Sequence, residues 1–131
     1  MDSAKLLKYS LLAGALYFAA ISVVHVLGVK IPGLFIYYNV PSHQYQDNII
    51  SFLAFGWAAF FYSGAHNLNI VKAILLAAVV ALLGLANINI STNFSLLSEG
   101  ISVTPFWLQF ILLCFYIGWL ALLSFKVQAT K

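Results

Sequence analysis

Residues 106–125 read FWLQFILLCFYIGWLALLSF, a run of 20 positions that contains no charged side chain. A helix needs about 20 apolar residues to cross the hydrocarbon core of a bilayer. Three further apolar runs occupy residues 9–29, 49–65 and 73–90. Inside lipid, only helices and closed barrels satisfy their backbone polar groups, and these runs lack the alternation of barrel strands. The sequence therefore predicts an all-α membrane protein with four transmembrane helices.

The composition of the whole chain agrees with a membrane protein. Hydrophobic residues make up 63% of the 131 positions, charged residues make up 7%, and the mean hydropathy is +1.00. An ordinary soluble domain has roughly 45–50% apolar and about 25% charged residues. This composition disfavours a soluble globular domain, a disordered chain and a nucleic-acid binder. The four spans leave no room for a soluble domain, so residues 1–131 are interpreted as one four-helix transmembrane domain.

The lysines predict the orientation of the chain in the membrane. If the four helices alternate in direction, five lysines fall on one side and only Lys30 falls on the other. Positive residues near membrane ends tend to stay in the cytoplasm. We therefore expect an antiparallel bundle with both termini cytoplasmic and the two longer loops, residues 30–48 and 91–104, outside. The five lysines on the cytoplasmic side are Lys5, Lys8, Lys72, Lys126 and Lys131.

The connection between the first and second spans has an unusual composition for a loop. Residues 31–42 read IPGLFIYYNVPS, which includes the aromatic segment 35–38. This stretch is too apolar for a loop that is free in water, and it is shorter than the roughly 17 residues that a span requires. The sequence predicts an interfacial or re-entrant segment between the first two helices.

His25 is the only strongly polar side chain in the first span, about four residues from its outer end. An ionisable residue inside a membrane span is costly to bury and is a functional candidate for that reason. A neutral imidazole at the interface, bonded to a carbonyl or to water, is one interpretation. The other is a ligand or a proton-transfer group that faces the bundle, because the imidazole pKa allows either role.

His43 and Asp47 lie four residues apart at the start of the second span. If that helix begins at Ser42, both side chains share one face, which Ser51 and Ala54 continue. The carboxylate would then orient or charge the imidazole. The alternative is a solvated helix start in which the N-terminal dipole favours Asp47.

Two histidines and a carboxylate form a known metal-ligand set, which makes His25, His43 and Asp47 weak candidates for metal ligands. Their spacing is not a local motif, so a metal site is not favoured. The chain has no glycine-rich phosphate loop, no His-Glu-x-x-His and no cysteine pair. The sequence leaves the cofactor unknown, because none of the motifs that would identify one is present.

Small residues recur four positions apart in the spans, where they allow helix backbones to approach each other. They favour either packing within the bundle or a seam between copies of the chain. The expected partners are the lipid bilayer and a second copy of the chain or a larger membrane complex, and no nucleic acid is expected. The pairs are Ala15 with Ala19, Ala54 with Ala58, and Cys114 with Gly118.

The polar residues predicted on the outer side favour a ligand-binding function. Asn87 ends the third span, where it either faces His25 across an outer vestibule or caps the last carbonyls of its helix. Ligand pockets are mostly apolar, with a few polar groups that fix orientation. We therefore expect a small membrane protein that binds or passes a lipophilic or small polar ligand at its outer face. The candidate ligand-binding residues are His25, Tyr38, His43, Asp47 and Asn87.

Two other functions remain open at this point. The shortage of catalytic groups is typical of a non-catalytic accessory subunit or scaffold in a larger membrane complex. An integral membrane enzyme that uses the outer His/Asp group as acid–base or metal ligands is the third possibility, and the same shortage argues against it.

Overall fold

The computed structural model describes residues 2–35, 37–97 and 99–129, and these form helices joined by turns. Four helices are long and apolar enough to cross a membrane, which confirms the prediction of an all-α chain with four such helices. The long helices are α1 (Ser3–Val26), α2 (Gln44–His66), α3 (Val71–Ile90) and α5 (Thr104–Ala129). The short elements are the 3-10 helix η1 (Leu68–Ile70), which leads into α3, and α4 (Thr92–Leu97).

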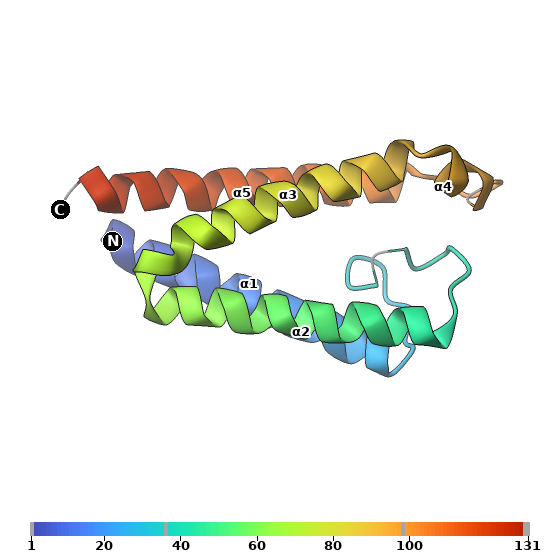
Figure 1. Cartoon of the computed structure of the whole chain (residues 1–131), viewed down its shortest axis with the longest axis horizontal. Coiled ribbons are helices and arrows are strands. Elements are labelled where there is room, and N and C mark those ends of the chain that lie inside the picture. The colour runs from blue at the N-terminus through green and yellow to red at the C-terminus, as the bar shows by residue number, and fades with distance from the viewer. Residues whose placement is uncertain (1, 36, 98, 130–131) are drawn as a thin grey trace.

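The helices form two neighbouring pairs, α1 with α2 and α3 with α5, and α1 also packs against α5. Figure 1 shows both chain termini at one end of the molecule, together with the turn that contains η1. We call this end the terminal end. Residues 27–35, residues 37–43 and α4 lie at the opposite end, which we call the loop end (Figure 1).

Gly28 ends α1. Its φ of +64° lies in the left-handed region that favours glycine. The N–H of Gly28 donates to the carbonyl of His25 at 3.2 Å, and the N–H of Val29 donates to the carbonyl of Val24 at 3.0 Å. These two bonds make a Schellman motif, which satisfies carbonyls at the end of a helix. The motif stops α1 at Val26, three residues before the end of the apolar run, and it places His25 in the last turn.

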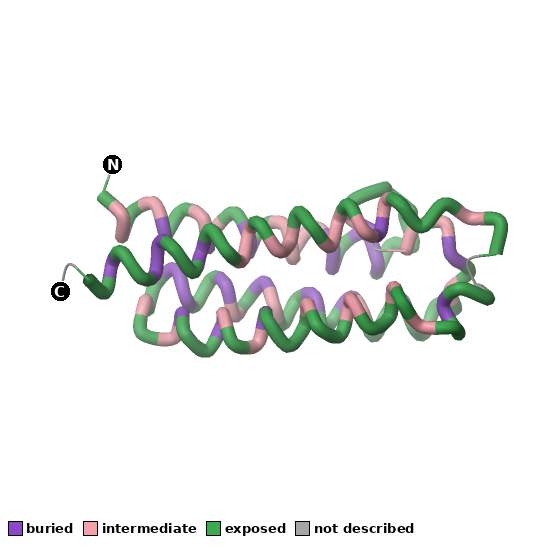
Figure 2. Tube along the Cα trace, turned by 90° about the horizontal axis from the view of Figure 1, so that it is seen from above, coloured by how far each residue is buried: buried purple, intermediate pink, exposed green. Residues whose placement is uncertain are grey.

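A hydrophobic core fills the terminal end. It joins α1, α2, α3 and α5, and Figure 2 shows that buried positions recur between exposed ones along the long helices. The predicted small residues Ala15, Ala54 and Ala58 are buried inside the chain, whereas Gly118 is exposed. The largest fully buried members of this core are Leu7, Leu11, Phe61, Ile74 and Leu120.

Gly14 allows α5 to approach α1. The Tyr116 hydroxyl donates to the carbonyl of Ser10 at 2.7 Å. A Cβ at Gly14 would overlap the Tyr116 oxygen and would lie 3.1 Å from the Phe61 ring. The absence of a side chain at Gly14 is therefore what lets Tyr116 cross the face of α1 and join the two helices.

Aromatic side chains pack the loop end. The ring centroid of Tyr37 lies 5.1 Å from that of Phe94 and 4.9 Å from that of Phe106. Phe94 belongs to α4, a helix that forms within the stretch expected to be a polar loop. The Ser91 hydroxyl accepts from the N–H of Phe94 at 3.2 Å and so starts this helix. The contacts connect residues 27–43 to α4 and α5.

The outward faces of the long helices carry large apolar side chains. Leu16, Leu76 and Phe115 have exposed fractions of 74%, 69% and 74%. Soluble monomers rarely expose continuous apolar surface on this scale. The exposed faces therefore agree with the apolar length of the helices, and both indicate a multi-pass membrane protein.

Candidate functional site

The last turn of α1 carries a buried imidazole. His25 is 1% exposed and points toward the start of α2, where Asp47 is 9% exposed. Nδ1 of His25 lies 3.5 Å from Oδ1 of Asp47. An N–H···O hydrogen bond is usually 2.7–3.2 Å long, so this contact is a close pair of titratable groups rather than a formed hydrogen bond. The structure thus brings together two of the residues that the sequence singled out.

Several polar atoms of this pair have no hydrogen-bond partner among the described residues. They are Nδ1 and Nε2 of His25 and Oδ1 of Asp47. The second carboxylate oxygen of Asp47 accepts from the Ser42 hydroxyl at 3.1 Å. A buried polar atom without a partner costs about 1–3 kcal/mol. Such atoms are therefore available to a proton, a water molecule or a ligand group.

Phe35 covers the imidazole. Its ring stacks on His25 with centroids 3.8 Å apart and an interplanar angle of 23°, and its exposed fraction is 2%. The ring is held by a tight turn, in which the N–H of Phe35 donates to the carbonyl of Ile31 at 2.7 Å. Lys30 lies over the same ring, with Nζ 5.6 Å from the centroid. We call residues 31–35 the covering turn.

Two serines continue the polar contact between α1 and α2. The Ser51 hydroxyl donates to the carbonyl of Ser22 at 2.9 Å. The two hydroxyl oxygens are 3.2 Å apart, and because Ser51 has already used its proton, Ser22 donates in this second bond. Ser22 precedes His25 by three residues and Ser51 follows Asp47 by four, so each lies one helical turn from the pair. The four side chains form a polar seam between the helices.

A groove of about 640 Å³ opens between α1, the covering turn and α5. We call it the loop-end groove. Its walls are mostly apolar, and its polar groups are one amide and three phenols. A volume in the range of about 300–1,000 Å³ is typical of ligand sites. The lining residues that matter for the argument are Ala13, Tyr17, Tyr38, Gln109, Leu113 and Tyr116.

Tyr17 joins the three walls of the loop-end groove. Its hydroxyl donates to the carbonyl of Gly33 at 2.8 Å and accepts from Nε2 of Gln109 at 3.2 Å. Gly33 belongs to the covering turn, as Phe35 does. One face of this turn therefore meets the groove through Gly33, and another meets His25 through Phe35.

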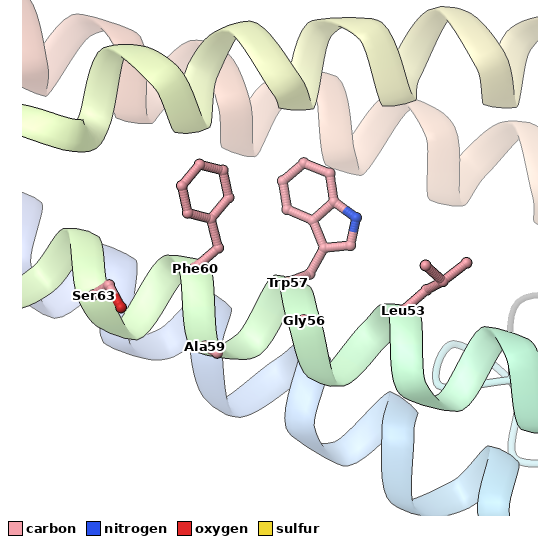
Figure 3. Close-up of a pocket in the computed structure, with 6 residues that line it drawn as sticks. All are labelled: Leu53, Gly56, Trp57, Ala59, Phe60 and Ser63. Carbon is pink, nitrogen blue, oxygen red and sulfur yellow. The ribbon is translucent and has the colours of Figure 1, made fainter.

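A second, apolar cavity of about 240 Å³ lies between all four long helices. Leu113 and Tyr116 line both this cavity and the loop-end groove, so these two side chains separate them. Figure 3 shows Trp57 and Phe60 pointing from α2 toward α3, at a surface pocket of about 450 Å³. Leu53 and Trp57 line both the inner cavity and this pocket, so these two side chains separate them.

The remaining predicted residues lie in different places. Tyr38 lines the loop-end groove. His43 is exposed, and its ring stacks on Tyr45 with centroids 5.7 Å apart. It is the N-cap of α2, which begins at Gln44 and not at Ser42, the start that would have placed His43 and Asp47 on one face. His43 therefore does not share the buried face of Asp47.

Asn87 is exposed on α3, and its neighbour Asn89 makes the contact with the connection. The Tyr37 hydroxyl donates to Oδ1 of Asn89 at 3.1 Å. Burial raises the pKa of Tyr37 to about 12, so this phenol keeps its proton at neutral pH. Nδ2 of Asn89 and Oδ1 of Asn39 are buried without a hydrogen-bond partner within the described part of the chain.

Within residues 2–35, 37–97 and 99–129, no group of three His, Cys, Asp or Glu side chains is placed to hold a metal ion. His25 and Asp47 lie together, but His43 is exposed at the helix start. The weak metal candidates of the sequence thus do not form a three-ligand set in this conformation.

Sequence reasoning missed Tyr17, Phe35 and Gln109. Gln109 had a visible signal, since it is a strongly polar residue inside the apolar run 106–125. Phe35 had none, because its role depends on a turn that folds back onto α1.

Comparison with protein-family models, with curated proteins and with solved structures found no match to this chain.

Proposed function

We propose that this chain is a small multi-pass membrane protein that binds a lipophilic ligand with one polar end in the loop-end groove. The observation that carries the proposal is the groove itself, with apolar walls around Tyr17, Tyr38 and Gln109. Apolar walls favour a hydrocarbon or ring system, and the amide and phenols favour a carbonyl or hydroxyl group at one end of it.

The proposed orientation places the groove near the outer surface of the membrane. The four long helices cross the bilayer as an antiparallel bundle, with the terminal end in the cytoplasm and the loop end outside. Residues 27–43 then lie at the interface as the predicted interfacial segment. The lysine distribution supports this orientation, because four of the five described lysines belong to the terminal end.

The predicted site residues have different roles in this proposal. Tyr38 contacts the ligand directly, since it lines the groove. His25 and Asp47 support the covering turn from its other face through Phe35. His43, Asn87 and association with a second copy or a larger complex stay predictions of the sequence.

Retention of a bound lipophile tests the proposal. Ala13 lines the groove, so Ala13→Phe would fill it, whereas Ala73→Phe adds the same ring at an exposed position of α3 outside the pockets described. The chain is purified in mild detergent and the compounds extracted from it are identified by mass spectrometry. We expect wild type and Ala73→Phe to retain one enriched lipophile that Ala13→Phe loses. Bulk membrane lipids in their ordinary ratios, in all three proteins, would refute the proposal.

A second candidate function is acid–base chemistry at His25, favoured by its buried ring nitrogens without described hydrogen bonds. In that case a compound that reaches the imidazole, rather than one confined to the groove, would be recovered in two chemical forms, which wild type interconverts and His25→Gln does not. Recovery of a single unchanged form from both proteins would leave ligand binding and exclude this chemistry.

A further inference from the structure

A small pocket of about 210 Å³ opens at the terminal end, between α1, η1, α3 and α5. We call it the terminal-end pocket. The segments that line it belong to the terminal end, and α4 lies at the opposite end of the molecule (Figure 1). Its lining residues are Leu7, Leu68, Asn69, Lys72, Ser124, Val127 and Gln128.

The polar side chains of the terminal-end pocket are suited to an anion. Lys72 brings an ammonium group, Asn69 and Gln128 bring amide groups, and Ser124 brings a hydroxyl group. Nε2 of Gln128 donates to Oγ of Ser124 at 3.2 Å, which leaves the serine proton free to donate to another acceptor. Among the described residues, no carboxylate lines the pocket. The ion pair recorded among the described side chains joins His25 to Asp47. It therefore lies away from this pocket, at the loop end.

The floor of the same pocket is apolar. Leu7 and Val127 are buried members of the hydrophobic core, and Leu68 packs against that core. Polar donors around an apolar floor fit an amphiphile better than a free inorganic anion, because the floor gives no hydrogen bonds to hydrated oxygens.

The surroundings of the pocket add positive charge. Lys5 and Lys8 are exposed on the first turns of α1, and Lys126 is exposed near the end of α5. The described acid of this end is Asp2, whose carboxylate accepts from the N–H of Ala4 at 3.2 Å. Basic pockets between membrane helices on the cytoplasmic side bind the headgroups of anionic lipids.

We infer that the terminal-end pocket binds the phosphodiester headgroup of an anionic phospholipid, with Lys72 as its main cationic contact. The phosphate oxygens accept from Lys72, Asn69 and Ser124, and the glycerol part lies against the apolar floor. The inference shares membrane insertion with the proposed function but not the groove, its ligand or its residues.

The test compares three compounds on the full chain in detergent: phosphatidylglycerol, phosphatidylcholine with the same acyl chains, and inorganic phosphate. Native mass spectrometry measures the bound fraction of each lipid, and thermal unfolding measures the effect of all three. We expect phosphatidylglycerol to bind and to raise the unfolding temperature, and the other two compounds to do neither. Equal effects of the two lipids would overturn the inference. Stabilisation by inorganic phosphate alone would overturn it too, because the pocket would then bind a free anion and not a lipid.

Two variants locate the binding. Lys72→Gln removes the contact in the pocket, whereas Lys8→Gln removes the same charge from an exposed position that does not line it. A charge-assisted hydrogen bond of about 1.5–3 kcal/mol corresponds to roughly tenfold or more in affinity. We therefore expect Lys72→Gln to weaken phosphatidylglycerol binding about tenfold and Lys8→Gln to weaken it by less than about twofold. Equal losses would show a general surface attraction and would refute the pocket.

A second pair of variants distinguishes loss of lipid binding from loss of folding and from failure of the proposed function. Asn69→Asp places a negative charge at the exposed rim of the pocket and should abolish phosphatidylglycerol binding without disturbing the core. Ala13→Phe, which fills the loop-end groove, should leave that binding unchanged. Phosphatidylglycerol binding that survives Asn69→Asp would contradict the inference, whatever happens to the groove ligand.

Discussion

His25 and Asp47 meet across the contact between α1 and α2, with 3.5 Å between Nδ1 and Oδ1. The two residues are 22 positions apart in the sequence, and residues 31–35 between them fold back so that Phe35 covers the imidazole. Removing one partner from a buried pair of titratable groups leaves the other desolvated and unpaired. The end of α1, the start of α2 and the covering turn therefore depend on each other for stability.

Asp47→Ala should destabilise this end of the molecule. The substitution removes the acceptor of the Ser42 hydroxyl at a part-buried position and the neighbour of the buried His25. We expect a loss of about 1–3 kcal/mol in the free energy of unfolding, measured by denaturation in detergent. Glu99→Ala is the matched control, because Glu99 is an exposed acid. An equal effect of the two substitutions would contradict the role of the pair.

Phe35→Ala should uncover His25. The wild-type imidazole is 1% exposed, whereas His43 and His66 are exposed, so diethyl pyrocarbonate should modify His25 far more slowly than the other two. Without the Phe35 ring we expect the rate at His25 to approach theirs, as followed by peptide mass spectrometry. Phe52→Ala, at an exposed position of α2, should leave all three rates unchanged. Equal rates at the three histidines in wild type would show that the covering turn does not protect His25.

Gly14→Ala should weaken the contact between α1 and α5. A Cβ at this position overlaps the Tyr116 hydroxyl, and overpacking of this kind costs about 1–3 kcal/mol. Adding Tyr116→Phe should recover part of the loss, because it removes the overlapping oxygen. Gly56→Ala is the control, since nothing lies within 4 Å of its Cβ. Thermal unfolding of the four proteins measures the effect, and a neutral Gly14→Ala would contradict this packing.

Gly28→Ala should loosen the end of α1. The φ of +64° at Gly28 costs a residue with a Cβ about 1–2 kcal/mol. The same substitution at Gly84, which lies inside α3 with open space around it, should instead stabilise the helix by about 1 kcal/mol. Chemical denaturation compares the two variants, and changes of the same sign would rule out the Schellman motif as the reason that α1 ends at Val26.

Tyr37 should make stability fall in alkaline solution. Burial raises its pKa from 10.0 to about 12, so between these values the folded chain binds more protons at Tyr37 than the unfolded chain does. The contribution of Tyr37 to the free energy of unfolding is therefore fully present below pH 10 and is lost as the pH rises through about 12. Tyr37→Phe should remove this part of the decrease, measured as the difference between the two proteins in unfolding free energy across that range. Parallel curves for the two proteins would show that Tyr37 does not contribute.

The helices were largely predictable because they follow from the hydropathy summed over about 20 consecutive residues. The apolar runs at 73–90 and 106–125 fall inside α3 and α5, and only the ends differ. The ends depend on turn chemistry that hydropathy does not measure, such as the positive φ of Gly28 or the N-cap at His43. The helix α4 was missed because its six residues lie in a polar stretch and gain order from Phe94 contacts with Tyr37 and Phe106.

The candidate site was predictable only in part. His25 and Asp47 stood out because an ionisable residue at the edge of an apolar run is costly to bury and is a functional candidate for that reason. Gln109 had a signal as a polar residue inside the apolar run 106–125, whereas Phe35 and Tyr17 did not stand out, since aromatic side chains are ordinary in a membrane protein. The sequence did not show which member of each pair, Asn87 or Asn89 and His43 or Asp47, makes the tertiary contact. The rotation of α3 separates the first pair in the fold, and the start of α2 separates the second.

The sequence by itself determined that the chain forms four apolar helices, because hydrophobicity summed over about 20 residues depends on composition and not on neighbours. Only the tertiary structure decided that His25 faces Asp47, that Phe35 covers the imidazole, and that Tyr17, Gly33 and Gln109 meet at one groove. These contacts depend on how each helix is tilted and rotated about its axis. Close packing sets both angles, through positions such as Gly14, where the absence of a side chain lets another helix approach.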